Sequence, residues 1–194
     1  MRRADCKKDM TAQAAARKRA IVRLMWDEDL GAFLDYDWRS GRRVSRINAA
    51  TAYPLFVDLA DANQVRRAAK AIRTSLLEPH GLATTTENTG QQWDAPNGWA
   101  PLQWVAIDGL RRHGQEDLAE DIATRWVKEN ARVYCQTGKL VEKYDVRSAG
   151  QGMGGEYPVQ DGFGWTNAIF VKLLTIYPAL AREKYEFTGA ACGG

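Results

Sequence analysis

At residues 91–101 the chain reads Gln91-Gln92-Trp93-Asp94-Ala95-Pro96-Asn97-Gly98-Trp99-Ala100-Pro101. Two indoles, a carboxylate and a turn stand there immediately before an amphipathic helix. That helix begins near residues 99–101, because proline is tolerated in a first helical turn. It ends at His113-Gly114, and a second helix runs from Gln115 to about Cys135. The sequence therefore predicts two antiparallel helices joined by a tight glycine turn.

Apolar residues at helical spacing recur on both sides of this pair. We expect further helices over residues 11–25, with Thr11 placed to cap the first turn, and over residues 165–177, stopped by Pro178. Residues 54–59 and 62–77 favour one or two helices, ended by Pro79 and Gly81. Residues 27–38 favour a short hairpin or a loop, and residues 82–92 favour a polar loop. Because no convincing set of alternating strands is present, the sequence predicts an all-α fold.

Size and charge restrict the class of protein. A chain of 194 residues that is 45% hydrophobic is long enough for one domain with a proper core. We expect a single domain over 1–194, with 1–17 and 179–194 peripheral or poorly ordered. A net charge of +3, without a basic cluster beyond the first twenty residues, does not indicate nucleic-acid binding. Without an apolar run of about 18 to 20 residues, we expect no membrane partner and no signal peptide.

The cysteines do not indicate a metal site. Cys6, Cys135 and Cys192 are widely spaced, and the sequence holds only two histidines. Neither a zinc site nor a disulfide framework is supported by this spacing. We therefore expect no metal and no cofactor, and we expect Cys135 to be a small buried apolar residue.

Two further motifs join residues 91–101 in a family resemblance. They are Glu142-Lys143-Tyr144-Asp145-Val146 and Gly154-Gly155-Glu156-Tyr157-Pro158-Val159-Gln160-Asp161-Gly162-Phe163-Gly164-Trp165-Thr166-Asn167. In this order the three stretches resemble the trehalases, inverting glycosidases that split trehalose into two glucoses. The resemblance runs from about Lys18 to Tyr177 and implies the C-terminal part of an (α/α)6 barrel, or roughly its last five or six helices. An incomplete barrel of this kind would expose helix faces that normally meet neighbours.

The resemblance also assigns the general base. Hydrolysis with inversion needs an acid that protonates the leaving oxygen and a base, about 6.5 to 9.5 Å away, that activates water. Glu142 falls where the trehalase pattern places this base. From the residues alone, Glu142 would instead be a solvated carboxylate that pairs weakly with Lys139 or Lys143.

A long glycine-rich segment follows Glu142. Residues 141–161 are too long for a simple connection, which favours a functional loop. The glycine-rich loop at residues 150–164 suits a mobile lid that closes on a sugar. By the resemblance, Glu156 binds substrate from this lid. A flexible surface loop without a ligand is the alternative for such a composition.

Aromatic and carboxylate side chains together are the usual chemistry of sugar recognition. We expect Trp93 to face the C–H side of a pyranose, Asp94 to accept hydroxyl hydrogen bonds, and Phe163 with Trp165 to add walls. Asp94 is equally suited to cap the helix after Pro96. Four indoles, taken singly, favour core positions because they fall in helical apolar patterns: Trp99, Trp104, Trp126 and Trp165.

The general acid of the trehalases is an Asp on an earlier loop, in a Gly-Trp-Asp-Phe-like setting. This chain offers only Met25-Trp26-Asp27 and Gln92-Trp93-Asp94, and neither has that context. The resemblance therefore implies a trehalose-hydrolysing enzyme, periplasmic or cytoplasmic, whose N-terminal portion is the partner that supplies the acid. The alternative is a non-catalytic sugar-binding remnant. Another helical-barrel glycosidase is disfavoured because separate motifs agree on the trehalases.

Overall fold

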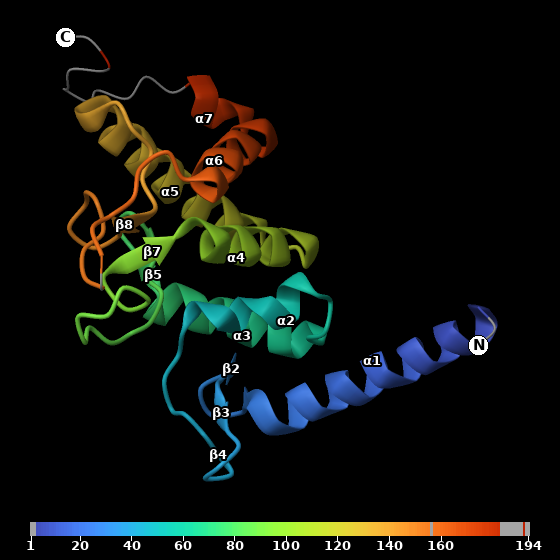
Figure 1. The fold of residues 1–194 in the computed structure, drawn as a ribbon. Helices are drawn as coiled ribbons and strands as arrows, with labels where there is room; N and C mark the ends of the chain where they lie inside the picture. The colour runs from blue at the N-terminus through green and yellow to red at the C-terminus, as the bar shows by residue number, and fades with distance from the viewer. Residues whose placement is uncertain (1–2, 156, 183–191, 193–194) are drawn as a thin grey trace.

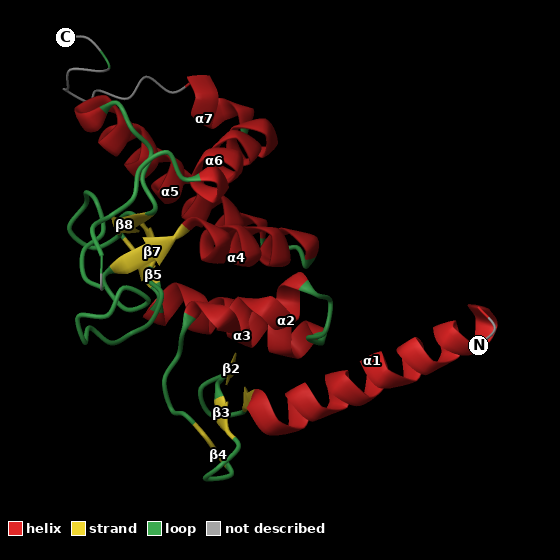
Figure 2. Cartoon of the chain, viewed as in Figure 1, coloured by secondary structure: helices red, strands yellow, loops and turns green. Residues whose placement is uncertain are grey.

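A computed structural model describes residues 3–155, 157–182 and 192 of the chain (Figure 1). Helices dominate these residues, and the strands are two or three residues long and pair only in twos (Figure 2). The helical elements are α1 (Arg3–Met25), the 3-10 helix η1 (Ala49–Ala52), α2 (Tyr53–Phe56), α3 (Ala62–Ser75), α4 (Ala100–Arg112), α5 (Glu116–Thr137), α6 (Gly164–Ile176) and α7 (Pro178–Arg182). The antiparallel pairs are β1 (Trp26–Asp27) with β2 (Ala32–Phe33), β3 (Tyr36–Asp37) with β4 (Arg42–Arg43), β5 (Leu77–Glu78) with β6 (Gly81–Leu82), and β7 (Asn97–Trp99) with β8 (Lys143–Asp145). The predicted all-α class is confirmed, with these short pairs added between the helices.

The antiparallel pair α4 and α5 forms the centre of the fold. Gly114, at φ 71°, makes the tight turn between the two helices, and Gly138, at φ 72°, ends α5 in the left-handed conformation. Gly114 stands where the sequence predicted the end of the first of these helices, and α5 ends two residues beyond the predicted end near Cys135. α2 and α6 also pack on α4 (Figure 1). Fully buried apolar side chains fill these contacts: Leu55, Ile107, Leu110, Ile122 and Trp126.

The predicted helix over residues 62–77 is confirmed as α3, and its first turn is closed by a capping box. The Gln64 backbone N–H donates to Asp61 Oδ1 at 2.8 Å, and the Asp61 backbone N–H donates to Gln64 Oε1 at 3.1 Å. After α3 the chain turns back through the β5–β6 pair. This hairpin leads directly into the loop that carries Trp93.

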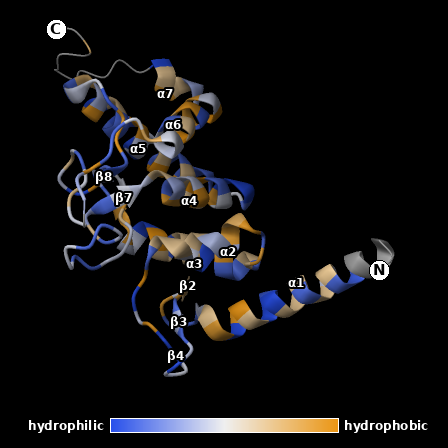
Figure 3. Cartoon of the chain, in the orientation of Figure 1, coloured by the Kyte–Doolittle hydropathy of each residue, from blue (hydrophilic) through white to orange (hydrophobic). Residues whose placement is uncertain are grey.

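The first helix is longer than predicted. α1 begins at Arg3, so Thr11 lies inside the helix and the expected cap at Thr11 is wrong. Residues 8–19 are exposed, and Figure 1 shows α1 running away from the other helices. In Figure 3 the apolar colour gathers at the end of α1 next to β1. Good helix formers (Ala, Lys and Arg) extend α1 where no apolar period is present.

The last predicted helix is confirmed as α6, which ends before Tyr177. Pro178 then occupies the first position of a short further helix, α7, which was not predicted. α6 carries apolar residues on several sides, yet only Thr166 and Leu173 are buried. Val171 is 62% exposed. A helix that carries apolar residues on every side is normally buried on every side. The exposed apolar side of α6 is the kind of surface that we expected of an incomplete barrel.

Cys135 and Cys192 form a disulfide, which corrects the expectation of a free thiol at Cys135. Their Cα atoms lie 4.9 Å apart although 57 residues separate them in sequence. Cys135 is buried as predicted. Among the described helices, none is long and apolar enough to cross a membrane.

The disulfide fixes the number of free thiols. We expect one reactive thiol per denatured, unreduced chain in a thiol titration with a chromogenic disulfide reagent, and three after reduction. Cys192→Ser should raise the unreduced count to two, whereas Cys6→Ser should lower it to zero. Three thiols before reduction would show that the bond is not formed.

Candidate active site

The pairing of β7 with β8 brings the two sequence motifs of the site together. Trp99 lies opposite Lys143, Gly98 opposite Tyr144 and Asn97 opposite Asp145. Figure 1 shows this pair on the side of the molecule where the long loops gather. Antiparallel neighbours in such a pair are in direct contact across the strands. The residues that follow Trp93 therefore lie beside those that follow Glu142.

Aromatic rings form a continuous column next to this pair. Trp93 stacks on Trp99 with ring centroids 3.9 Å apart and planes 2° from parallel. Trp165 meets Trp99 edge-on at 5.9 Å, and Phe163 lies 4.7 Å from Trp165. Trp99 is buried, as predicted, whereas Trp93 is 46% exposed. Since Trp99 covers one face of Trp93, the exposed part of this ring can meet an apolar sugar face.

Glu142 is almost fully buried, with an exposed fraction of 2%. Its Oε1 accepts a hydrogen bond from the Tyr157 hydroxyl at 2.9 Å, and this bond, with burial and the charge of Glu142, raises the pKa of Tyr157. No described residue donates a hydrogen bond to Oε2. Glu142 is therefore not solvated, and Lys139 pairs with Asp161 instead, whereas the expected pairing with Lys143 is present at 4.0 Å.

Lys143 contributes a buried cation to the same site. Its side chain is 0% exposed, and Nζ lies 4.0 Å from Glu142 Oε2. Nζ donates to Gln92 Oε1 at 3.2 Å and to the Gly154 carbonyl at 3.1 Å. A charge taken out of water is tolerated only when it is paired and hydrogen-bonded. The site is therefore a buried polar cluster packed against the aromatic column.

Asp94 is buried, with its two carboxylate oxygens used inside its own loop. Oδ2 accepts from the backbone N–H and the hydroxyl of Thr89, both at 2.6 Å, and Oδ1 accepts from the Thr85 hydroxyl and the Ala95 N–H. Burial alone would raise the pKa of Asp94, but these hydrogen bonds outweigh it and leave the pKa lowered. The helix-capping alternative is wrong, since the residue before α4 is Trp99 and no side chain caps that helix.

The structure brings Trp93, Phe163 and Glu142 into one connected cluster, and Asp94 orders the loop beneath Trp93. Glu156 lies outside the described residues. Sequence reasoning missed the roles of Lys143 and Tyr157. Both stand in the motifs that carried the family resemblance, and that neighbourhood is the signal that would have found them.

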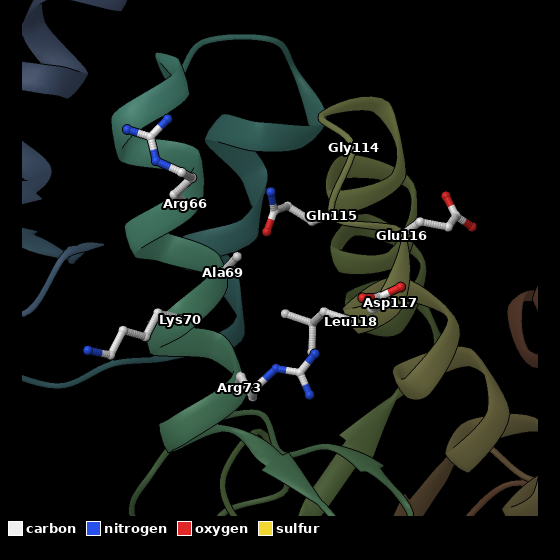
Figure 4. Close-up of a pocket in the computed structure, with 9 residues that line it drawn as sticks. All are labelled: Arg66, Ala69, Lys70, Arg73, Gly114, Gln115, Glu116, Asp117 and Leu118. Atoms are coloured by element: carbon white, nitrogen blue, oxygen red, sulfur yellow. The ribbon is translucent and has the colours of Figure 1, made fainter.

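A pocket of about 420 Å³ lies elsewhere, between α3 and the first turn of α5 (Figure 4). Arg73 of α3 points toward α5, whereas Lys70 of α3 and Glu116 of α5 point away from each other. Among the described residues that line this pocket, none is aromatic. Arg73 pairs with Asp121 and Glu116 with Arg111, so these charges already have partners within the chain. The aromatic column and Glu142 remain the candidate active site.

Paired helices with aromatic and carboxylate side chains in the loops at one side define part of a helical toroid of the glycoside hydrolase type. The comparison with known proteins agrees. The trehalase family matches residues 1–178, and the chain belongs to this family.

The relatives cover most of this chain. It is 51% identical over 173 residues to a periplasmic trehalase of Pseudomonas aeruginosa, a match that covers 89% of this chain and 32% of the relative. A periplasmic trehalase of Escherichia coli is 47% identical over 164 residues, covering 84% of this chain and 29% of the relative. The chain thus spans about a third of the length of these relatives.

Solved structures show the same fold. Neutral trehalase of Saccharomyces cerevisiae matches with a TM-score of 0.75 and 31% identity, over 89% of this chain and 32% of that one. A mannosylglycerate hydrolase of Thermus thermophilus matches with a TM-score of 0.62 and 22% identity, over 78% of this chain and 37% of that one. The second likeness concerns the fold alone. The predicted C-terminal part of an (α/α)6 barrel is confirmed.

Gly98 leaves no room for a side chain at the β7–β8 pair. A Cβ at this position would lie 2.5 Å from Val146 Cγ1 and 2.8 Å from the Leu82 carbonyl oxygen. We expect Gly98→Ala to lower the free energy of unfolding by about 1 to 3 kcal/mol, because overpacking must push the strands apart. Denaturant unfolding measures this. Gly164→Ala, where a Cβ meets open space, is the control; equal stability of the two variants would contradict the close fit.

The lowered pKa of Asp94 predicts an acid-sensitive contribution to stability. A carboxyl whose folded pKa lies below its unfolded value of 3.8 stabilises the fold above that pH, and the stabilisation is lost as the pH falls below it. We expect Asp94→Asn to cost about 1 to 3 kcal/mol at pH 7, and to cost clearly less at pH 3. Urea unfolding at both pH values measures the difference. The exposed Asp29→Asn variant should change stability little at either pH, and a pH-independent cost for Asp94→Asn would refute the assignment.

Proposed function

We propose that this chain carries the general base and part of the sugar site of an enzyme that hydrolyses α,α-trehalose to two glucoses with inversion. The observation that carries the proposal is the buried Glu142 carboxylate, held at Oε1 by Tyr157 in the cluster that contains the half-exposed Trp93. Family membership supports the reaction and the substrate.

In this mechanism Glu142 takes a proton from the attacking water. Tyr157 fixes one carboxylate oxygen, so Oε2 is the atom that receives the proton. Trp93 offers its exposed ring to the C–H face of one glucose unit, and Phe163 lies at the far end of the same aromatic column. We assign Glu156 to substrate binding from the glycine-rich loop, and Asp94 to ordering the loop that presents Trp93.

The general acid would come from the portion of a trehalase that this chain does not span. Inversion requires that acid about 6.5 to 9.5 Å from the base, on the opposite side of the glycosidic bond. We therefore propose an N-terminal trehalase portion as the partner. The second candidate function is a sugar-binding remnant that holds glucose units at Trp93 and hydrolyses nothing.

We propose the periplasm as the compartment. The matched bacterial relatives are named periplasmic trehalases. The Cys135–Cys192 disulfide supports an oxidising compartment, because disulfides persist there and are rare in the reducing cytosol.

A glucose-release assay separates the two functions. The purified chain is incubated with trehalose alone and with a supplied N-terminal trehalase portion, and the anomers of the released glucose are followed by proton NMR. Turnover only in the reconstituted sample, with one β-glucose formed per trehalose, supports the enzyme. Binding without release in both samples supports the remnant, and release by the chain alone would contradict an acid from the other portion.

Glu142→Gln tests the base in the reconstituted enzyme. We expect a loss of several orders of magnitude in kcat with KM nearly unchanged, because the amide cannot accept the proton in the transition state. The exposed Glu120→Gln on α5 is the matched control and should keep full activity. A loss of less than about tenfold for Glu142→Gln would exclude it as the base.

A further inference from the structure

Lys143 is a buried cation whose hydrogen-bond partners lie on two different loops. Its side chain is fully buried. Nζ donates to Gln92 Oε1 on the loop that carries Trp93 and to the Gly154 carbonyl on the glycine-rich loop, residues 150–164. Because an ammonium in this environment must be hydrogen-bonded, it ties the two loops to each other through one atom.

Aromatic rings hold the same ammonium from two sides. Nζ lies 5.5 Å from the ring centroid of Trp99 and 5.3 Å from that of Tyr157. Both distances fall within the range of cation–π attraction. Tyr157 belongs to the glycine-rich loop, so this loop meets Lys143 at Gly154 and again at Tyr157.

The other anchors of the loop lie toward its two ends. Near the C-terminal end, the Gln160 carbonyl accepts from the Glu142 N–H and the Gly162 N–H donates to the Leu140 carbonyl, both at 2.9 Å. The Gly152 N–H donates to the Lys143 carbonyl at 2.9 Å, and the Asn97 side chain bonds both the N–H and the carbonyl of Met153. These bonds fix the loop against β7 and β8 as far as Met153. Further along, Gly154 lies against Lys143 and Gly90, Gly155 lies against Gln92, and Tyr157 bonds to Glu142.

Glu142 lies next to the ammonium without being hydrogen-bonded to it. The distance from Nζ to Glu142 Oε2 is 4.0 Å, beyond hydrogen-bond range but close enough for attraction between the charges. An ammonium has three donors, and the two loops use two of them. While the loops hold Lys143, the buried Oε2 accepts no hydrogen bond from a described residue, which leaves it as the acceptor for a reacting water.

We propose that Lys143 is a positioning residue that fastens the glycine-rich loop to the Trp93 loop over Glu142. When the glycine-rich loop lifts, Nζ keeps Gln92 Oε1 but loses the Gly154 carbonyl and the Tyr157 ring, and Glu142 Oε2, at 4.0 Å, is the acceptor that replaces them. The ammonium then pairs with the carboxylate and occupies Oε2. Loop closure and the availability of Oε2 as a base are thereby coupled through one side chain. The part of this inference that concerns Glu142 rests on the proposed function, whereas the part that concerns the loop does not.

Hydrogen exchange in the full chain tests the fastening. Lys143→Met keeps the length of the side chain and removes the charge. We expect the amides of Gly152 and Met153, which donate to the Lys143 carbonyl and to Asn97 Oδ1, to exchange at least tenfold faster than in the wild type, while amides in the middle of α5 stay within twofold. Lys70→Met, which removes an exposed lysine from α3, should change neither set. Exchange at Gly152 and Met153 within twofold of the wild type would overturn the proposal.

Two further variants keep the test decisive. If Lys143→Met does not fold, Gln92→Leu removes one acceptor and should speed loop exchange at least threefold; no change would overturn the proposal. Tyr157→Phe keeps the ring but loses the bond to Glu142, so loop exchange should stay within threefold of the wild type. If loop amides exchanged as fast in Tyr157→Phe as in Lys143→Met, the bond from Tyr157 to Glu142 would be what fastens the loop. Since exchange needs no turnover, a normal loop in Lys143→Met refutes only this inference. An active Glu142→Gln refutes the proposed base, and with it the coupling to Glu142, but leaves the fastening of the loop standing.

Discussion

The three-residue pairing of β7 with β8 is the constraint on which the site depends. It sets Trp99 opposite Lys143 and so joins segments that are more than forty residues apart in sequence. Neighbouring backbone bonds extend the pairing, from the Val146 N–H to the Pro96 carbonyl and from the Gly152 N–H to the Lys143 carbonyl. An isolated pair of such short strands would not be stable in water. It persists here because α4 follows directly from β7 and buries Trp99 at the junction.

Buried charges give the loops around this pair their defined positions. Glu129 of α5 is 1% exposed and accepts from Arg132 at 2.6 Å and from the Gly150 N–H, also at 2.6 Å. Asp94 performs the same task for its own loop, and Lys143 does so between the two loops. A satisfied buried polar network specifies one arrangement, because every alternative leaves a charge without a partner. These long loops have no periodic pattern of apolar residues. A few buried, hydrogen-bonded charged side chains define their conformations instead.

Apolar residues at helical spacing and helix-ending residues were enough to predict most helices. Contacts between residues far apart in the sequence could not be predicted from these local patterns. The α4–α5 pair was predictable because apolar residues recur at helical spacing in both helices, and Gly114 and Gly138 follow their ends. Glu142 and Trp93 were predictable as neighbours only through the family resemblance. The partners of Asp94 depend on a loop that folds back on itself, and the Cys135–Cys192 bond spans 57 residues. Lys143 was overlooked because a lysine is almost always exposed, and its place beside Glu142 in the matched motif does not by itself show that rings will enclose it.

α6 contacts the segment that carries Glu142 and also has an exposed apolar side that further helices would cover. The Thr166 hydroxyl donates to the Val141 carbonyl at 2.8 Å, one residue before Glu142, and Trp165 of the same helix touches Trp99 edge-on. α6 therefore holds both the Glu142 segment and the aromatic column. Yet its Val171 side is exposed, and half-buried apolar residues flank it. The relatives are about three times as long as the matched region, and neighbouring helices that covered α6 would restrain it. Because α6 in turn positions Val141 and Trp99, packing of a complementary portion on this helix would stiffen the base and the sugar platform together.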